Sequence, residues 1–302
     1  MVKNLVLENI SVGFKLPQGV FYAVDDVSLS LPGGNFTAII GESGCGKSVL
    51  GQAILNILPS GVVKKGRVLY NGEQVKKILS AFGIIPQNPS ESLNPVRKIG
   101  KQMQDVLDVH QMADSDNSYK KQCLRLFGLE EAERVLAAYP HELSGGMLQR
   151  VLCAMAVSSK PEWILADEPT KGLDEQVGAI VRKNLLTIKQ DLHLSMLIIT
   201  HDIALAQEVC DDVLVMYAGQ VLEHNADIWH KPLHPYTKGF LQALPKNGLQ
   251  VIPGKAPVPG ESFTGCKFAA RCPYCTTRCK EEMPAMQQVG NAEVRCFLYA
   301  EG

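Results

Sequence analysis

The segment Gly41–Ser48 reads GESGCGKS and has the residue types and spacing of a phosphate-binding loop. It fits the pattern G-x-x-x-x-G-K-[ST] and stands between an apolar run that predicts a strand and a run that predicts a helix, as such a loop requires. The N–H groups of the loop and the positive end of the helix favour a phosphate anion. We therefore expect Lys47 to reach the β- and γ-phosphates of a nucleotide and the Ser48 hydroxyl to bind Mg²⁺.

The three glycines of this loop let the backbone bend and approach the phosphates closely. Cys45 lies inside the loop, and we expect it to be a small filler that faces away from the nucleotide. The candidate nucleotide-binding residues of the loop are Gly41, Glu42, Ser43, Gly44, Cys45, Gly46, Lys47, Ser48 and Val49.

Two acidic residues end the apolar run WILADE, Trp163–Glu168. A carboxylate at the C-terminal edge of a strand, beside a phosphate loop, is where a Mg²⁺-linked aspartate belongs. We assign this role to Asp167. Glu168 would then face the γ-phosphate and polarise a water molecule for in-line attack.

The segment LSGGMLQR, Leu143–Arg150, predicts a second anion-binding helix start. Ser144 is followed by Gly145 and Gly146, which allow close approach of the backbone at the beginning of a helix-like run. A chain with two phosphate-binding elements suggests a nucleotide held between two chains.

These segments together resemble the ATP-binding cassette (ABC) ATPases. Three further elements complete the family's order across residues 1–225, namely Gln87 in IIPQNP, Asp174 in EPTKGLDE and His201 in IITHD. The resemblance implies a head-to-tail dimer in which Ser144, Gly145 and Gly146 touch the γ-phosphate bound by the partner subunit. It also implies roles for single residues: Glu168 as the catalytic base, His201 on the γ-phosphate, Gln87 on Mg²⁺ and water, and Asp174 across the dimer interface.

Three positions qualify this resemblance. Phe14 sits where the family often places an aromatic ring that stacks on adenine, although a phenylalanine of the core is an equal alternative. Lys171 stands where the family usually has serine, which puts a charge near the partner's site. Leu148 follows LSGGM where a polar or basic residue is common. Neither Lys171 nor Leu148 replaces a core catalytic group, so we expect a competent site.

The elements that position these residues alternate between strand and helix. Strands are predicted at 4–10, 20–31, 36–40, 82–86, 163–167 and 195–200, helices at 47–58 and 175–190, and a hairpin at 213–224. Such alternation predicts an α/β fold with a mostly parallel sheet. For an ABC cassette this means a P-loop NTPase domain over residues 1–230, with an inserted helical subdomain at about 91–158. Residues 231–302 form a small proline- and cysteine-rich C-terminal extension.

Composition excludes several other classes of protein. The chain has 302 residues with 30 Lys and Arg against 31 Asp and Glu, so its overall charge does not favour nucleic acid as a partner. No apolar run approaches the roughly 18–20 residues that cross a bilayer. The N-terminus is interrupted by Asn4, Glu8 and Asn9, so we expect no signal peptide and a cytoplasmic chain.

Two further segments, 86–102 (PQNPSESLNPVRKIGKQ) and 231–244 (KPLHPYTKGFLQAL), resemble the oligopeptide/dipeptide/nickel importer ATPases, as does the cysteine-containing tail. The resemblance implies an ATPase at the cytoplasmic face of the cell membrane, paired as a heterodimer with a related ATPase. It further implies two membrane permeases, on which the helical segment docks, and an extracellular binding protein. Peptides are the expected substrates, and nickel or a metal–chelator complex is the alternative. A soluble ABC protein acting on DNA or ribosomes fits less well, and a small-molecule kinase would not explain LSGGM.

Five of the nine cysteines lie in the last 37 residues, spaced Cys266-x5-Cys272-x2-Cys275-x3-Cys279 and then Cys296. In a reduced cytoplasm this density indicates a metal site rather than disulfides. The spacing leaves a zinc site and an iron–sulfur cluster open. The resemblance to the importer ATPases implies a [4Fe–4S] cluster on Cys266, Cys272, Cys279 and Cys296, with Cys275 as an extra thiol.

Overall fold

The computed structural model describes residues 3–17, 19–74, 81–244, 248, 250–258 and 261–300. The chain divides into two compact units, each assembled from separate stretches of sequence. The first unit contains Met1–Lys3, Pro32–Phe36 and Lys76–Val209. The second unit contains Asn4–Leu31, Thr37–Val75 and Cys210–Gly302.

The first unit is built on three parallel strands in the order β6-β7-β8, namely β6 (Phe82–Ile85), β7 (Trp163–Asp167) and β8 (Ser195–Ile199). The β8 side chains are all buried, and those of β7 are buried up to its last residue. Parallel strands that are covered on both faces have continuous apolar sequences, in which apolar and polar residues do not alternate. For this reason the sequence predicted β7 and β8 to within one residue.

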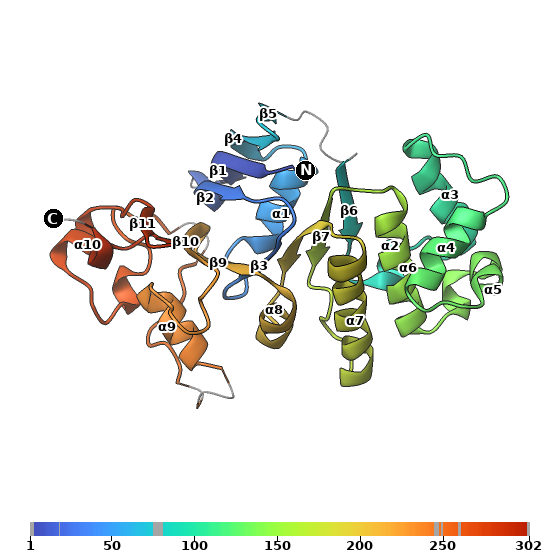
Figure 1. Ribbon diagram of the computed structural model, residues 1–302. Coiled ribbons are helices and arrows are strands. Elements are labelled where there is room, and N and C mark those ends of the chain that lie inside the picture. Colours follow the sequence, from blue (N-terminus) through green and yellow to red (C-terminus); the bar gives the residue numbers. More distant parts are fainter. Residues whose placement is uncertain are drawn as a thin grey trace. The chain divides into compact units, whose positions relative to one another are not determined.

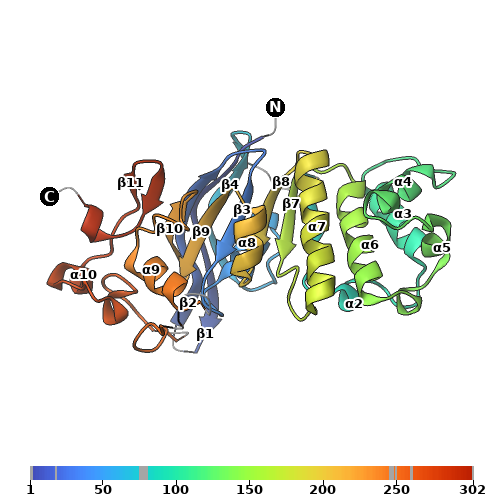
Figure 2. The same cartoon turned by 60° about the horizontal axis from the view of Figure 1, so that its bottom comes forward.

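Helices make up the rest of the first unit. Between β6 and β7 the chain forms α2 (Pro89–Ser92), α3 (Ile99–Val109), α4 (Ser118–Leu126), α5 (Ala132–Ala137), the short 3₁₀ helix η2 (Pro140–Glu142) and α6 (Gly145–Ser158). After β7 come α7 (Glu175–Asp191) and α8 (Ile203–Val209). Figures 1 and 2 show α3, α4 and α5 gathered on one side of α6, with α7 along its other side.

The second unit contains an antiparallel sheet and a mixed group of strands. The antiparallel sheet has the order β2-β1-β4-β5, with β1 (Leu5–Leu16), β2 (Gly19–Leu31), β4 (Val63–Tyr70) and β5 (Glu73–Gln74). The other group has the order β11-β12-β10-β9-β3, with β3 (Phe36–Ile40), β9 (Asp212–Tyr217), β10 (Gln220–Asn225), β11 (Gln287–Val289) and β12 (Ala292–Val294). In this group β3 and β9 run parallel, and the remaining pairs are antiparallel.

The helices of the second unit are α1 (Lys47–Leu55), α9 (Pro235–Gln242), α10 (Thr277–Glu281) and the 3₁₀ turns η4 (Ala269–Arg271) and η5 (Phe297–Tyr299). Helix α1 is shorter than the predicted 47–58. It ends because Asn56 adopts a left-handed conformation, with φ of 57°, and its N–H bonds back to Ala53 and Gln52. The predicted hairpin is confirmed, since Ala218 and Gly219 both have positive φ between β9 and β10. Within the described residues, no helix has both the length and the apolar character needed to span a bilayer.

Candidate functional site

The phosphate loop connects the fully buried strand β3 to helix α1. Gly41, Gly44 and Gly46 all have positive φ, at 149°, 78° and 105°. A Cβ atom at Gly41 would lie 2.2 Å from the Met216 carbonyl oxygen, and one at Gly46 would lie 2.1 Å from the Ala23 carbonyl oxygen. Glycine at these two positions is therefore required both by the backbone conformation and by the neighbouring strands β9 and β2.

Lys47 is the first residue of α1 and its side chain lies over the loop. The residue is only 8% exposed, and its Nζ donates hydrogen bonds to the Gly41 and Glu42 carbonyl oxygens at 2.9 and 3.1 Å. Cys45 is buried beneath it, and desolvation raises the pKa of this thiol. The Lys47 ammonium group is thus bound to the carbonyl oxygens of the loop itself, and Cys45 is a small buried residue beside it.

Asp167, Glu168 and His201 stand at the C-terminal ends of the neighbouring parallel strands β7 and β8. Asp167 is the last residue of β7 and pairs with Ile199, the last residue of β8. Glu168 follows in a left-handed conformation with φ of 48°, and its N–H donates to the Ile199 carbonyl at 2.8 Å. The parallel register therefore brings the residues after the two strands together.

Glu168 and His201 make a direct contact. The His201 Nδ1 atom lies 2.6 Å from Glu168 Oε2, and the His201 N–H points to the same oxygen at 3.3 Å. Because a carboxylate only accepts hydrogen bonds, Nδ1 carries the hydrogen in this contact and Nε2 is directed elsewhere. Glu168 is 12% exposed and His201 is 58% exposed, so an oriented carboxylate lies beneath an accessible imidazole.

The other predicted residues of the first unit lie at element ends. Gln87 is exposed, two residues after β6. Ser144 is the N-cap of α6, and its hydroxyl accepts from the Met147 N–H, while Gly145 and Gly146 begin the helix. Asp174 caps α7 by accepting from the Val177 N–H, and Lys171 is exposed beside it. Ser144 and Gly145 are exposed and Gly146 is buried, so the start of this helix is open to solvent.

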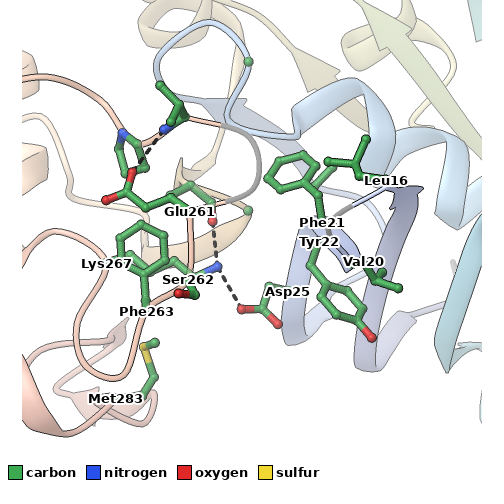
Figure 3. Close-up of a pocket in the computed structure, with 17 residues that line it drawn as sticks. Leu16, Val20, Phe21, Tyr22, Asp25, Glu261, Ser262, Phe263, Lys267 and Met283 are labelled. Atoms are coloured by element: carbon green, nitrogen blue, oxygen red, sulfur yellow. Dashed lines mark hydrogen bonds and ion pairs between the residues drawn. The ribbon is translucent and has the colours of Figure 1, made fainter.

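A cavity of about 360 Å³ opens beside the phosphate loop and is lined by Gly44 of that loop. Figure 3 shows Phe21 and Tyr22 of β2 on one side and Phe263 on the other, with Lys267 ion-paired to Asp25 at 2.8 Å. Phe14 is not among the lining residues. It is, however, the direct cross-strand partner of Phe21, and such partners project to the same face of a sheet.

One cavity of about 170 Å³ is lined by four cysteines and by apolar residues that include Phe268. The four are Cys266, Cys272, Cys279 and Cys296. Cys275 is not among the lining residues, and its sulfur lies 3.5 Å from the Thr276 carbonyl oxygen. Burial raises the pKa of Cys266 to about 11 and raises those of Cys272 and Cys296. Thiolates in this cavity would therefore need a cationic partner. Among the described residues, no three His, Cys, Asp or Glu side chains are placed so as to hold a single metal ion.

Sequence reasoning did not find the partners of Glu42. Its carboxylate binds the Arg271 guanidinium, and its N–H donates to the Tyr236 hydroxyl. Arg271 is separated from Glu42 by 229 positions. It lies in the cysteine-containing tail that resembles the importer ATPases, but that resemblance does not say which residue Arg271 contacts.

Two family models match the chain. One is described as ABC transporter and matches residues 24–171. The other is described as the C-terminal region of oligopeptide/dipeptide transporters and matches residues 222–279, which include three of the four cavity cysteines.

Curated relatives match over nearly the whole chain. The oligopeptide transport ATP-binding protein OppD of Haemophilus influenzae is 34% identical, with 98% of each chain covered. The dipeptide transport ATP-binding protein DppD of Escherichia coli is 36% identical, covering 95% of this chain and 94% of its own.

Solved structures match about three quarters of the chain. Among them is cbiO1 from Clostridium perfringens, part of the ABC transporter complex cbiONQ. It has a TM-score of 0.62 at 26% identity and covers 74% of this chain and 89% of its own. A dimeric bacterial ABC transporter cassette matches with a TM-score of 0.60 at 26% identity, covering 72% of this chain and 96% of its own.

Proposed function

This chain belongs to the ATP-binding subunits of ABC transporters, in the oligopeptide/dipeptide group, and on that premise we propose that it hydrolyses ATP to drive peptide uptake by a membrane complex. The observation that carries the enzymatic part is the contact between Glu168 and His201 at the ends of β7 and β8. It provides an oriented carboxylate and an accessible imidazole in a cassette that also has an intact phosphate loop.

In the proposed reaction Glu168 polarises a water molecule for in-line attack on the γ-phosphate, and His201 stabilises the γ-phosphate through Nε2. Lys47 and the N–H groups of the loop neutralise the phosphates. Asp167, Ser48 and Gln87 would hold Mg²⁺, whose charge offsets the charge that develops in the transition state. Phe14 and Phe21 share one face of the β1–β2 hairpin, and we propose that this face receives the adenine ring.

The cassette would act as a head-to-tail dimer. Ser144, Gly145 and Gly146 would contact the nucleotide held by the partner subunit, and Asp174 would lie at the interface. The exposed position of Ser144 and Gly145 at the start of α6 supports this assignment. ATP would then hold two subunits together, and loss of phosphate would release them, which is a switch driven by differential affinity. We propose a related second ATPase as the partner.

The remaining components follow from the same proposal. Two membrane permeases and an extracellular binding protein would complete the importer, with this chain bound peripherally at the cytoplasmic face. Peptides are favoured over nickel or a metal chelate because the relatives compared are named for oligopeptides and dipeptides. We propose residues 1–230 as the functional cassette, with the helices at 91–158 as the subdomain that docks on the permease, and 231–302 as the C-terminal extension.

For the extension we propose a [4Fe–4S] cluster on Cys266, Cys272, Cys279 and Cys296. The support is that these four thiols line one cavity that excludes Cys275. Bound iron would supply the positive charge that these buried thiolates need.

Iron content and colour test this proposal. Protein purified without oxygen should contain iron and be brown. The Cys275→Ser protein should keep both properties, and the Cys272→Ser protein should lose them. Colourless protein with one zinc per chain would instead support the zinc site.

Uptake of labelled dipeptide tests the transport proposal. A strain that lacks this gene should lose uptake, the wild-type gene should restore it, and Glu168→Gln should not. Measuring nickel uptake in the same strains separates the two substrate classes. If dipeptide uptake is unchanged and nickel uptake falls, the chain serves a metal importer.

A further inference from the structure

Each polar group of Glu42, the second residue of the phosphate loop, has a partner in the second unit. Its N–H donates to Tyr236 Oη at 3.1 Å, and its carbonyl oxygen accepts from Lys47 Nζ at 3.1 Å. Its carboxylate accepts two hydrogen bonds from Arg271, from Nη1 to Oε2 and from Nη2 to Oε1, both at 3.1 Å. Glu42 is therefore held through both its backbone and its side chain.

The Arg271 side chain also contacts residues other than Glu42. Its Nε donates to the Pro253 carbonyl at 3.1 Å, and its Nη1 also donates to Tyr217 Oη at 3.3 Å. The guanidinium carbon lies 5.7 Å from the centroid of the Tyr217 ring and 6.0 Å from that of Phe268. The Arg271 side chain is 7% exposed and that of Glu42 is 26% exposed. A two-pronged arginine–carboxylate pair in such surroundings fixes geometry, which an exposed ion pair does not.

The cysteine-rich segment provides this arginine. Arg271 ends the turn η4, directly before Cys272, and the turn is closed by hydrogen bonds from the Ala269 N–H to the Cys266 carbonyl and from the Arg271 N–H to the Phe268 carbonyl. Phe268 lines the cysteine cavity and packs against Tyr217 and Tyr236, with ring centroids 5.4 and 5.5 Å apart. The same short turn thus separates two cavity thiols and carries the side chain that reaches the phosphate loop.

We infer that Arg271 is a positioning residue for ATP binding, which ties the conformation of the phosphate loop to the fold of the cysteine-rich segment. The inference rests on the proposed role of this loop in binding ATP. A loop with three glycines has many accessible conformations, and fixing one of them before the nucleotide arrives strengthens binding. Arg271 does this from the side of the loop where Glu42 projects, and does not itself contact the phosphates.

The test is the affinity of the full-length chain for a fluorescent ATP analogue with Mg²⁺. We expect Arg271→Ala to weaken binding by about tenfold, the scale of one charge-assisted pair. The KM for ATP should rise by a similar factor, while kcat at saturating ATP stays within about twofold, because the reacting groups are untouched. Lys280→Ala removes one exposed positive charge from the same segment and should bind ATP as the wild type does.

A double-mutant cycle tests whether the Glu42–Arg271 pair causes the loss of ATP affinity. Glu42→Ala should also weaken ATP binding. The double variant Glu42→Ala with Arg271→Ala should lose no more affinity than the single variant with the larger loss. Losses that add in the double variant would overturn the inference, as would an Arg271→Ala protein that binds ATP normally. Failure of the wild-type chain to bind ATP would instead overturn the proposed function.

Two further variants keep the test decisive if Arg271→Ala does not fold. Arg271→Lys keeps the charge but loses the two-pronged geometry, so we expect an intermediate affinity. Exchanging the partners, with Glu42→Arg and Arg271→Glu together, should recover affinity relative to Arg271→Glu alone. Wild-type affinity in Arg271→Lys, or no recovery in the exchanged protein, would contradict a positioning role.

Discussion

At the scale of single residues, the groups proposed for nucleotide binding differ from those proposed for hydrolysis. Lys47 and the loop glycines form the proposed phosphate site, whereas the proposed base Glu168 contacts His201 and has its own left-handed backbone conformation. Substituting one residue from each group should therefore give two distinguishable defects.

Glu168→Gln removes a carboxylate but keeps the size and a carbonyl oxygen that can accept from His201. We expect ATP hydrolysis to fall by about 10²-fold or more, since the general base is lost, while ATP affinity changes by less than about threefold. Phosphate release and analogue binding measure the two quantities. Lys47→Ala is the matched comparison and should lose binding itself. Unchanged turnover in Glu168→Gln would remove Glu168 from its proposed role.

At the scale of elements, α6, whose N-cap is Ser144, packs closely against β6. A Cβ atom at Gly83 in β6 would lie 2.2 Å from the Ala156 carbonyl oxygen of α6. Because the obstacle is backbone, helix and strand would have to separate to admit a methyl group.

Gly83→Ala should therefore lower the free energy of unfolding by about 2–4 kcal/mol, measured by urea denaturation. Gly178→Ala is the control, because its Cβ would meet only the end of the flexible Arg182 side chain at 3.7 Å within α7. That variant should be unchanged or up to about 1 kcal/mol more stable, since alanine favours helix. Equal stabilities for the two variants would show that β6 and α6 are not packed as described.

The pairing of β10 with its neighbours includes a titratable group. His224 in β10 lies 3.5 Å from an Asp212 carboxylate oxygen in β9 and 3.3 Å from a Glu293 oxygen in β12. Burial lowers the pKa of His224, but the hydrogen bonds and charges of Asp212 and then Glu293 outweigh it, and the pKa is raised above its ordinary value.

A raised folded-state pKa stabilises the fold fully below the unfolded value of about 6.5, and this contribution is lost as pH rises through the folded value. The wild type should thus lose unfolding free energy relative to His224→Gln as the pH rises above about 6.5. His230→Gln, at an exposed histidine paired with Asp227, should follow the wild type. Parallel pH profiles for wild type and His224→Gln would contradict the prediction.

At the scale of the whole molecule, ATP is proposed to join two cassettes. When hydrolysis is blocked by Glu168→Gln, Mg²⁺ and ATP should convert a mixture of this chain and the proposed second ATPase into a stable dimer. Light scattering after size-exclusion chromatography should report a mass near the sum of the two chains. Lys47→Ala in this chain should weaken the shift, because one of the two shared nucleotides is lost. A mass that is the same with and without ATP would contradict the proposed switch.

The sequence by itself determined the phosphate loop, the two acids that end WILADE and most of the strands and helices around them. These features depend on local requirements: glycine where φ is positive, apolar runs in covered strands and a capping side chain at a helix start. Strands β4 and β12 were not predicted, because β4 has Lys65, Gly66 and Arg67 at three successive exposed positions and β12 has only three residues.

Only the tertiary structure decided which side chains meet. The register of β7 against β8 brings Glu168 to His201, and the packing of the C-terminal segment places the four cysteines that the resemblance named around one cavity. The same packing brings Arg271 to Glu42. Such contacts join residues far apart in the chain, and they depend on how whole elements pack, which no short pattern of residues encodes.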